Sequence, residues 1–165
     1  RHHCKSVRSA RFGGLFYWRK AIDMIFDLQT LFSNAQAITA TAGSTNTIDL
    51  GATGTIYGGS GALTRDIGKG EPINLLVQVV ETFNTLTSLK IDVELDSTES
   101  FTPDKTITLG TFLLASLVAG FQVPIQIIPD GVNLRYMRLK YTVAGTDPTL
   151  GKITAGIVMG RQTNG

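Results

Sequence analysis

A glycine-rich stretch, TIYGGSGALTRDIGKGEPI, occupies residues 55–73 and raises the question of phosphate binding. A P-loop has the pattern G-x-x-x-x-G-K-[ST], because its backbone N–H groups surround the phosphates and its hydroxyl binds magnesium. Here the Gly68-Lys69 pair is followed by another glycine, and Leu63 occupies the position of the upstream glycine. The dinucleotide pattern G-x-G-x-x-G also fails, since Thr64 stands where its last glycine belongs. Spacing therefore argues against a phosphate site.

Three carboxylates alternate along the stretch LKIDVELD, at Asp92, Glu94 and Asp96. This spacing puts them on one face of a strand, where they could bind calcium or act as paired catalytic acids. No EF-hand pattern accompanies them, and Lys90 continues the same face. We therefore expect a solvated outer face.

Histidine and cysteine occur only at His2, His3 and Cys4. Three adjacent residues do not easily face one ion, and a fourth ligand is missing. From Met24 onward the chain has neither residue type, which excludes Ser-His-Asp, Cys-His and most zinc chemistry there. We expect no catalytic residues, no metal, no cofactor and no enzyme activity.

A basic patch is conceivable at Arg135, Arg138 and Lys140. No aromatic residues are interleaved on that face, so direct nucleic-acid binding is not expected. An ordinary strand exterior, or an interface with an acidic partner, fits better. No apolar run approaches the ~20 residues of a membrane span, so no membrane partner is expected either.

Charge divides the chain at about Met24. Residues 1–23 carry six basic side chains and one acidic, a net of +5, whereas the rest carries nine basic and twelve acidic, a net of −3. Two interpretations stay open for residues 1–23. They are a leader without structural role, since Met24 resembles a natural start, or a basic arm that lies on a neighbouring subunit. Arm anchors would be Phe16, Tyr17 and Trp18, because aromatic residues are common interface hot spots.

The pattern over residues 24–165 indicates mostly strands, although residues 25–33 and 112–120 could each form a short helical turn. Period-two alternation predicts four strand residues facing inward at Leu89, Ile91, Val93 and Leu95. Two later strands repeat the pattern, with Met137, Leu139, Tyr141 and Val143 inward in one and Ile153, Ala155, Ile157 and Met159 inward in the other. Pro124 predicts an edge strand or a bulge at residues 121–128. With ~7–9 strands and no βαβ alternation, we expect one all-β domain, an antiparallel sandwich or barrel.

Three longer stretches carry a resemblance to a known family. They are MIFDLQTLFSNAQAITATAGSTN, then NTIDLG with LTRDIGKGEPINLLVQVVETF, and GVNLRYMRLKYTVAGTDPTLGKITAGIV. Over residues 24–162 the chain resembles the tailed-phage capsid cement, or decoration, proteins, of which one belongs to a Bordetella phage. The most specific signatures are RDIGKGEP at residues 65–72 and LRY at residues 134–136.

The resemblance implies a jelly-roll β-sandwich that binds outside an HK97-type capsid, on the virion surface, and bridges neighbouring capsomers. Its implied partners are the phage major capsid protein and a second copy in a homodimer. The glycine-rich loop then becomes a capsid-contact element, with Tyr57, Arg65, Asp66 and Lys69 as candidate contact residues. Because Arg65 and Asp66 lie among glycines, we expect them to matter for attachment and little for folding. The alternative function is a carbohydrate- or receptor-binding β-sandwich of a phage tail.

Overall fold

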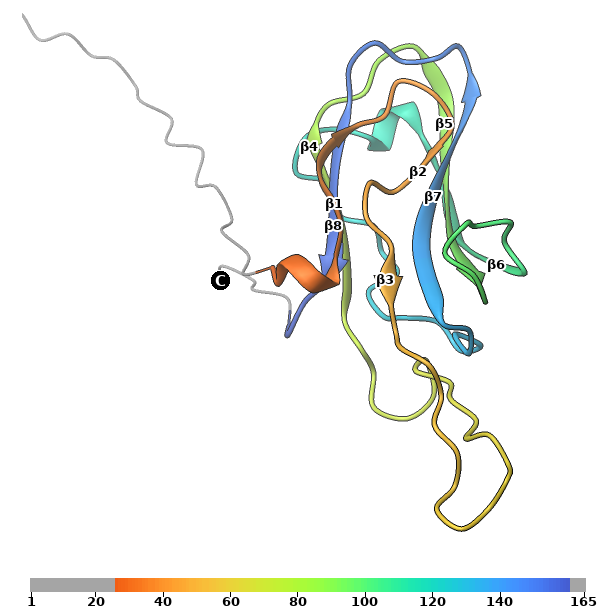
Figure 1. The fold of residues 1–165 in the computed structure, drawn as a ribbon. Coiled ribbons are helices and arrows are strands. Elements are labelled where there is room, and N and C mark those ends of the chain that lie inside the picture. Colours follow the sequence, from red (N-terminus) through yellow and green to blue (C-terminus); the bar gives the residue numbers. More distant parts are fainter. Residues whose placement is uncertain (1–25, 161–165) are drawn as a thin grey trace, which may run out of the picture.

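A computed structural model describes residues 26–160, which form an all-β sandwich of two antiparallel sheets (Figure 1). One sheet has the order β1 (Leu31–Ala37), β8 (Lys152–Ile157), β4 (Leu75–Glu81). The other has the order β2 (Ala42–Gly43), β7 (Tyr136–Gly145), β5 (Leu86–Asp96), β6 (Lys105–Leu113), and β3 (Ile48–Asp49) also pairs with β7. Two short 3-10 helices, η1 (Leu28–Thr30) and η2 (Leu114–Ser116), complete the elements.

The connectivity is that of a jelly roll. Residues 121–128 run beside β4 through two isolated bridges, Gln78 to Gln122 and Asn74 to Ile127. With this segment as the fourth member of the first sheet, most consecutive elements alternate between the two sheets. Pro124 has no N–H to donate, which explains why the segment forms bridges and no continuous strand.

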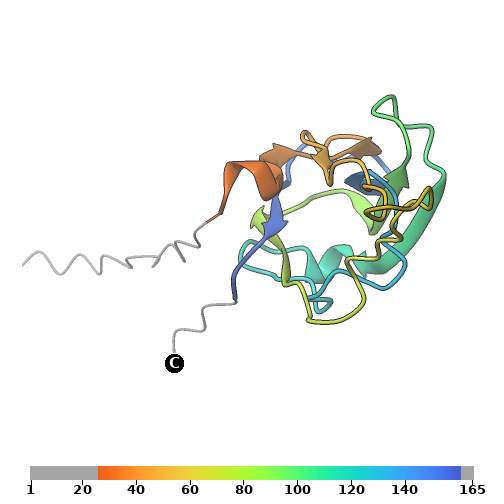
Figure 2. The same cartoon turned by 60° about the horizontal axis from the view of Figure 1, so that its bottom comes forward.

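The core lies between the sheets, and the elements surround it when the sandwich is seen from its lower end (Figure 2). The predicted inward residues of β5 are confirmed, since Leu89, Ile91, Val93 and Leu95 are all buried. On β7 the prediction also holds for Met137, Leu139 and Tyr141, and Val143 is partly buried. Period two therefore identified the dry faces of both central strands.

One hydroxyl pair links the two sheets through the core. The Tyr141 hydroxyl lies 2.8 Å from Ser33 Oγ, which donates a hydrogen bond to Gln36 Oε1. This pairing satisfies the polar end of a fully buried tyrosine. Burial raises the pKa of the Tyr141 hydroxyl well above its usual value.

The expected solvated face of β5 is wrong. Asp92, Glu94 and Asp96 are buried, at 3%, 7% and 1% exposure. The strand lies between β7 and β6, so neighbours cover it from both sides. Arg138 pairs with Glu94 at 2.7 Å, and the Phe101 ring covers the guanidinium group at 4.2 Å. Ion pairs cover Asp92 and Glu94 on this face, and charge alternation in a sequence does not distinguish such a face from a solvated one.

Met159 is the second correction. It was expected to face inward, but β8 ends at Ile157 and Met159 is fully exposed. Residues 1–23, with the candidate anchors Phe16, Tyr17 and Trp18 and the His2-His3-Cys4 group, lie outside the described residues.

Candidate functional site: a projecting loop and its arginine base

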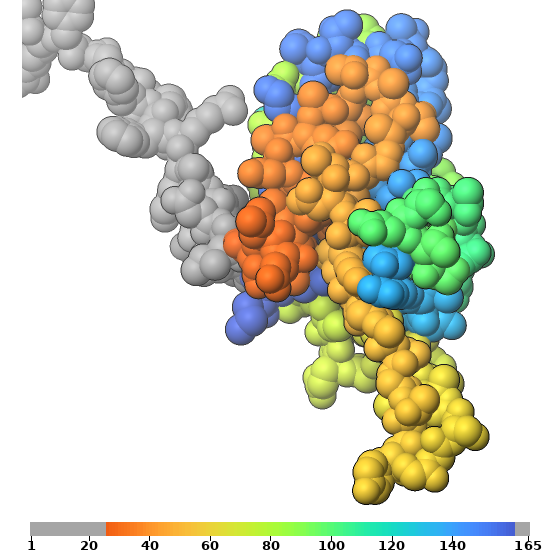
Figure 3. Space-filling view, in the orientation of Figure 1, coloured from red at the N-terminus to blue at the C-terminus, as the bar shows by residue number. Residues whose placement is uncertain are grey.

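The connection between β3 and β4 projects beyond the end of the sandwich (Figure 1). In the space-filling view its yellow tip stands clear of the body (Figure 3). Every residue from 52 to 64 is exposed, and none of them carries a charge. Three large apolar side chains are exposed there, Ile56 at 55%, Tyr57 at 104% and Leu63 at 50%. Apolar side chains displayed on an uncharged projection are typical of a protein contact surface.

The tip is a small hairpin of its own. Leu63 N donates to Gly54 O at 2.9 Å, and Ile56 N donates to Gly61 O at 3.2 Å. Its turn passes through Gly58, whose φ of +74° favours glycine. Backbone bonds of this kind restrict the loop before any partner arrives, which reduces the entropy that binding costs.

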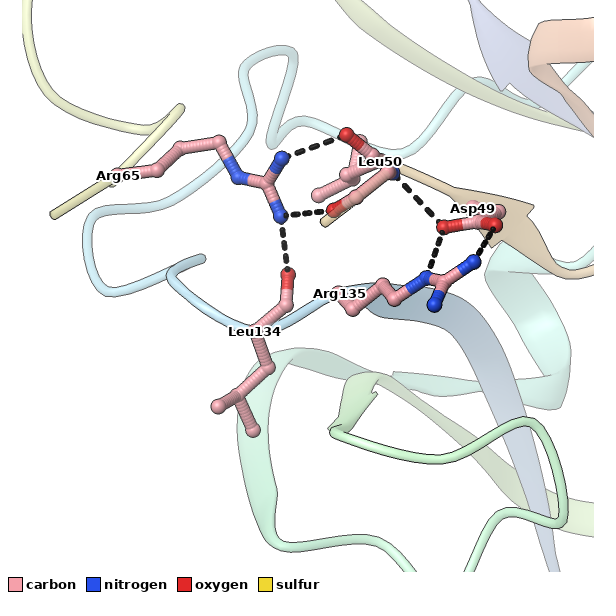
Figure 4. Close-up of polar contacts among 6 residues, drawn as sticks. Asp49, Leu50, Arg65, Leu134 and Arg135 are labelled. Atoms are coloured by element: carbon pink, nitrogen blue, oxygen red, sulfur yellow. Dashed lines mark hydrogen bonds and ion pairs between the residues drawn. The ribbon is translucent and has the colours of Figure 1, made fainter. Parts of the chain in front are cut away.

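Arg65 holds the base of the loop (Figure 4). Its guanidinium group donates to the carbonyl oxygens of Leu50 and Gly51, where the loop leaves β3. It also donates to Leu134 O at 3.4 Å, on the segment that leads into β7. One side chain therefore ties both ends of the loop to the sandwich.

Asp66 reinforces the same base from the next position. Its carboxylate accepts hydrogen bonds from Gly131 N at 3.0 and 2.9 Å and from Gly68 N at 3.1 Å. Gly68 packs so closely that a Cβ there would lie 2.0 Å from Pro129 O. The Arg65-Asp66 pair and its following glycine thus dock the loop onto the turn before β7.

Asp49 and Arg135 form an ion pair beside this base (Figure 4). Arg135 Nε and Nη2 donate to the two carboxylate oxygens of Asp49 at 2.9 and 2.8 Å, a bidentate arrangement. The hydrogen bond from Arg135, with that from Gly51 N, lowers the pKa of Asp49 to about 2. Arg135 also stacks on the Tyr136 ring at 4.8 Å.

The candidate contact residues fall into two groups. Tyr57 lies at the exposed tip and Lys69 is exposed near the base. Arg65 and Asp66 bond to backbone groups at the loop base, so we now predict that they stabilise the fold, against the expectation that they matter little for folding. Whether any of the four contacts a capsid stays a prediction.

Sequence reasoning missed the apolar tip residues Ile56 and Leu63 and the pairing of Asp49 with Arg135. The sequence could have indicated the apolar tip, since a charge-free loop with three large apolar residues is unusual. It could not have indicated the Asp49–Arg135 pair, because the two residues are 86 positions apart. The basic patch that Arg135, Arg138 and Lys140 could have formed does not exist as a unit, since Arg135 pairs with Asp49 and Arg138 with Glu94.

Residues 26–160 contain no group of three or more histidine, cysteine or acidic side chains that could hold a metal ion. Within the same residues no helix is long and apolar enough to cross a membrane.

The chain was compared with known proteins. A sequence model of the family Bbp16 matches residues 32–157, which is nearly the whole sandwich. No curated protein sequence matches the chain. The matched range lies within the stretch that carries the resemblance described above, and the family name fits the phage origin which that resemblance implied.

Proposed function

The chain belongs to the Bbp16 family, and from this premise we propose that it is a structural protein of a tailed-phage virion. In the proposed role it binds the outside of an HK97-type capsid and bridges neighbouring capsomers as a cement protein. Its partners are the major capsid protein and a second copy of itself, with no direct contact to nucleic acid or membrane.

The observation that carries the proposal is the loop at residues 52–64. Ile56, Tyr57 and Leu63 are exposed to solvent, so they gain hydrophobic free energy only when a partner covers them. Tyr57 is the only exposed aromatic side chain in residues 26–160. Aromatic anchors of this kind dominate the binding energy of many interfaces.

Bridging would act through avidity. A dimer that has docked one loop on one capsomer holds its second loop at high effective concentration near the next capsomer. Two modest contacts then resist the separation of capsomers more strongly than either contact alone. No catalytic group or cofactor is needed for this role.

A head-binding titration tests the proposal. Purified protein is added to phage heads that lack it, and bound protein is measured after sedimentation. The tip variant Tyr57→Ala should bind at least about tenfold more weakly, as for a hot-spot aromatic. Leu150→Ser is the matched control, since Leu150 is also exposed, at 53%, but follows β7 at the far end of the sandwich. Equal binding by Tyr57→Ala and wild type would refute the tip contact, and failure of wild type to bind heads would refute the cement role.

The tail-module alternative requires a different surface. A carbohydrate site needs an aromatic-lined groove or a calcium cluster, and Tyr57 stands alone as an exposed aromatic within the described part of the chain. We therefore do not propose it.

A further inference from the structure

A small recess opens at the base of the projecting loop, with a volume of about 270 Å³. Arg65 and Arg135 line it together with the polar side chains of Thr53, Ser97 and Asn133. Figure 4 shows the two guanidinium groups close together at the end of β3, where they contact three successive residues, 49 to 51. The recess therefore gathers two cations and several short polar groups beside the loop.

The charge of this recess is not balanced. Asp49 neutralises Arg135, but Arg65 contacts only neutral carbonyl oxygens. Glu99 is the other acid near Arg135, and it does not line the recess. No acidic side chain lines the recess at all. The residues that line the recess thus carry two positive charges and no negative one.

Donors are left over as well. Arg65 Nε is buried and has no hydrogen-bond partner, a state that proteins usually avoid. Among residues 26–160, the Thr53 hydroxyl and the Asn133 amide have no partner either, so both are free to donate. A recess lined by cationic and neutral donors and by no acidic side chain fits a small anion.

We propose that this recess binds a carboxylate side chain of the protein on which the loop docks. The identity of that protein rests on the proposed function, whereas the chemistry of the recess does not. Guanidinium groups bind carboxylates with two parallel hydrogen bonds, and a recess of about 270 Å³ has room for a carboxylate side chain. Thr53, at the start of the projecting loop, also lines the recess, so a partner that packs along the loop can place an aspartate or glutamate beside Arg135. Arg135 uses Nε and Nη2 for Asp49, which leaves Nη1 for this second carboxylate.

A protein carboxylate fits better than a nucleic-acid phosphate. Phosphate backbones are bound by broad basic surfaces that neutralise several charges at once. Residues 24–165 carry a net charge of −3, so the sandwich as a whole repels a polyanion. One local excess charge in an acidic body selects a single anionic side chain.

Two substitutions at the ion pair separate this role from a structural one. Asp49→Asn keeps an acceptor for Gly51 N but releases Arg135, so it should strengthen carboxylate binding several-fold. Arg135→Gln should weaken it at least about tenfold. If the pair only stabilised the fold, both substitutions would act in the same direction. Lys152→Gln is the matched control, because Lys152 forms an equally exposed ion pair with Glu81 elsewhere.

The free full chain is titrated with sodium acetate, against sodium chloride at equal ionic strength, and followed by NMR of the arginine and asparagine side chains. Saturable shifts at Arg65, Arg135 and Asn133, tighter in Asp49→Asn and lost in Arg135→Gln, support the proposal. Shifts that chloride reproduces, or equal weakening by both substitutions, overturn it. Binding of short duplex DNA that Arg135→Gln abolishes overturns it in favour of a phosphate site.

The same variants are then titrated onto heads. Stronger attachment of Asp49→Asn and weaker attachment of Arg135→Gln assign the carboxylate to the capsid. If heads bind both variants as tightly as wild type, the recess is not a capsid contact, and the proposed contact of the loop tip is unaffected. If wild type does not bind heads, the proposed function fails, and the acetate titration still decides whether the recess binds carboxylates.

Discussion

The substitution Arg65→Ala tests whether the Arg65 side chain stabilises the base of the projecting loop. Wild type makes three hydrogen bonds from a charged donor to backbone carbonyls at this site. Each such bond contributes roughly 1.5–3 kcal/mol when it is well made. The longest, to Leu134 O at 3.4 Å, is weak, and water can reach the freed carbonyls because the site is only part-buried. We therefore expect a loss of about 2–3 kcal/mol in the free energy of unfolding.

A loss of that size is measurable by two methods. For a domain of this length it lowers the melting temperature by roughly 6–10 °C, and it lowers the urea midpoint without changing the slope. Lys69→Ala is the matched control, since Lys69 is exposed in the same loop and its side chain makes no hydrogen bond among residues 26–160. Surface substitutions of that kind usually change stability by less than about 0.5 kcal/mol. If Arg65→Ala melts like Lys69→Ala, Arg65 does not hold the loop and the assignment is wrong.

Three further predictions concern the body. Val93→Asp places an unpaired charge in the core and should lose about 2 kcal/mol or more in urea unfolding; an unchanged midpoint would contradict the β5 register. Gly68→Ala places a Cβ 2.0 Å from Pro129 O and should lower the free energy of unfolding by about 1–3 kcal/mol. Gly54→Ala, whose Cβ would have its nearest atom at 3.9 Å, should change it little. Equal melting temperatures for the two variants would show that the contact at Gly68 is not tight. Burial raises the Tyr141 pKa, so above pH ~10 this hydroxyl ionises more readily in the unfolded chain and the free energy of unfolding falls as pH rises. Tyr141→Phe should lose less stability than wild type between pH 9 and 11. Equal losses for the two proteins, measured by urea unfolding at both pH values, would contradict this prediction.

The fold was readable from the sequence to a large extent. Alternation located β5, β7 and β8 and identified most of their core-facing apolar residues, with Met159 as the exception, because one face of each strand meets the core and period two is a strong signal. Pro124 marked the irregular edge beside β4. Strand positions and their core-facing residues depend on neighbours along the chain, which is why the sequence pattern was sufficient to predict them.

Features that depend on distant pairing were not readable. Asp92, Glu94 and Asp96 looked solvated, because nothing in their own strand reveals that Arg138 and Phe101 cover that face. Arg65 looked like a surface residue for the same reason, since its acceptors at Leu50 and Leu134 come from other segments. The glycines around Arg65 suggested an open loop. Position 68, however, requires a glycine because the turn at Pro129 leaves no room for a side chain.

We propose that the projecting loop attaches this protein to the outside of a phage capsid. Electron cryomicroscopy of heads reconstituted with the purified protein tests this attachment most directly. We predict sandwich density on the outer shell, with Ile56, Tyr57 and Leu63 covered by capsid subunits. Heads without added density, or bound sandwiches whose loop tips point into solvent, would contradict it.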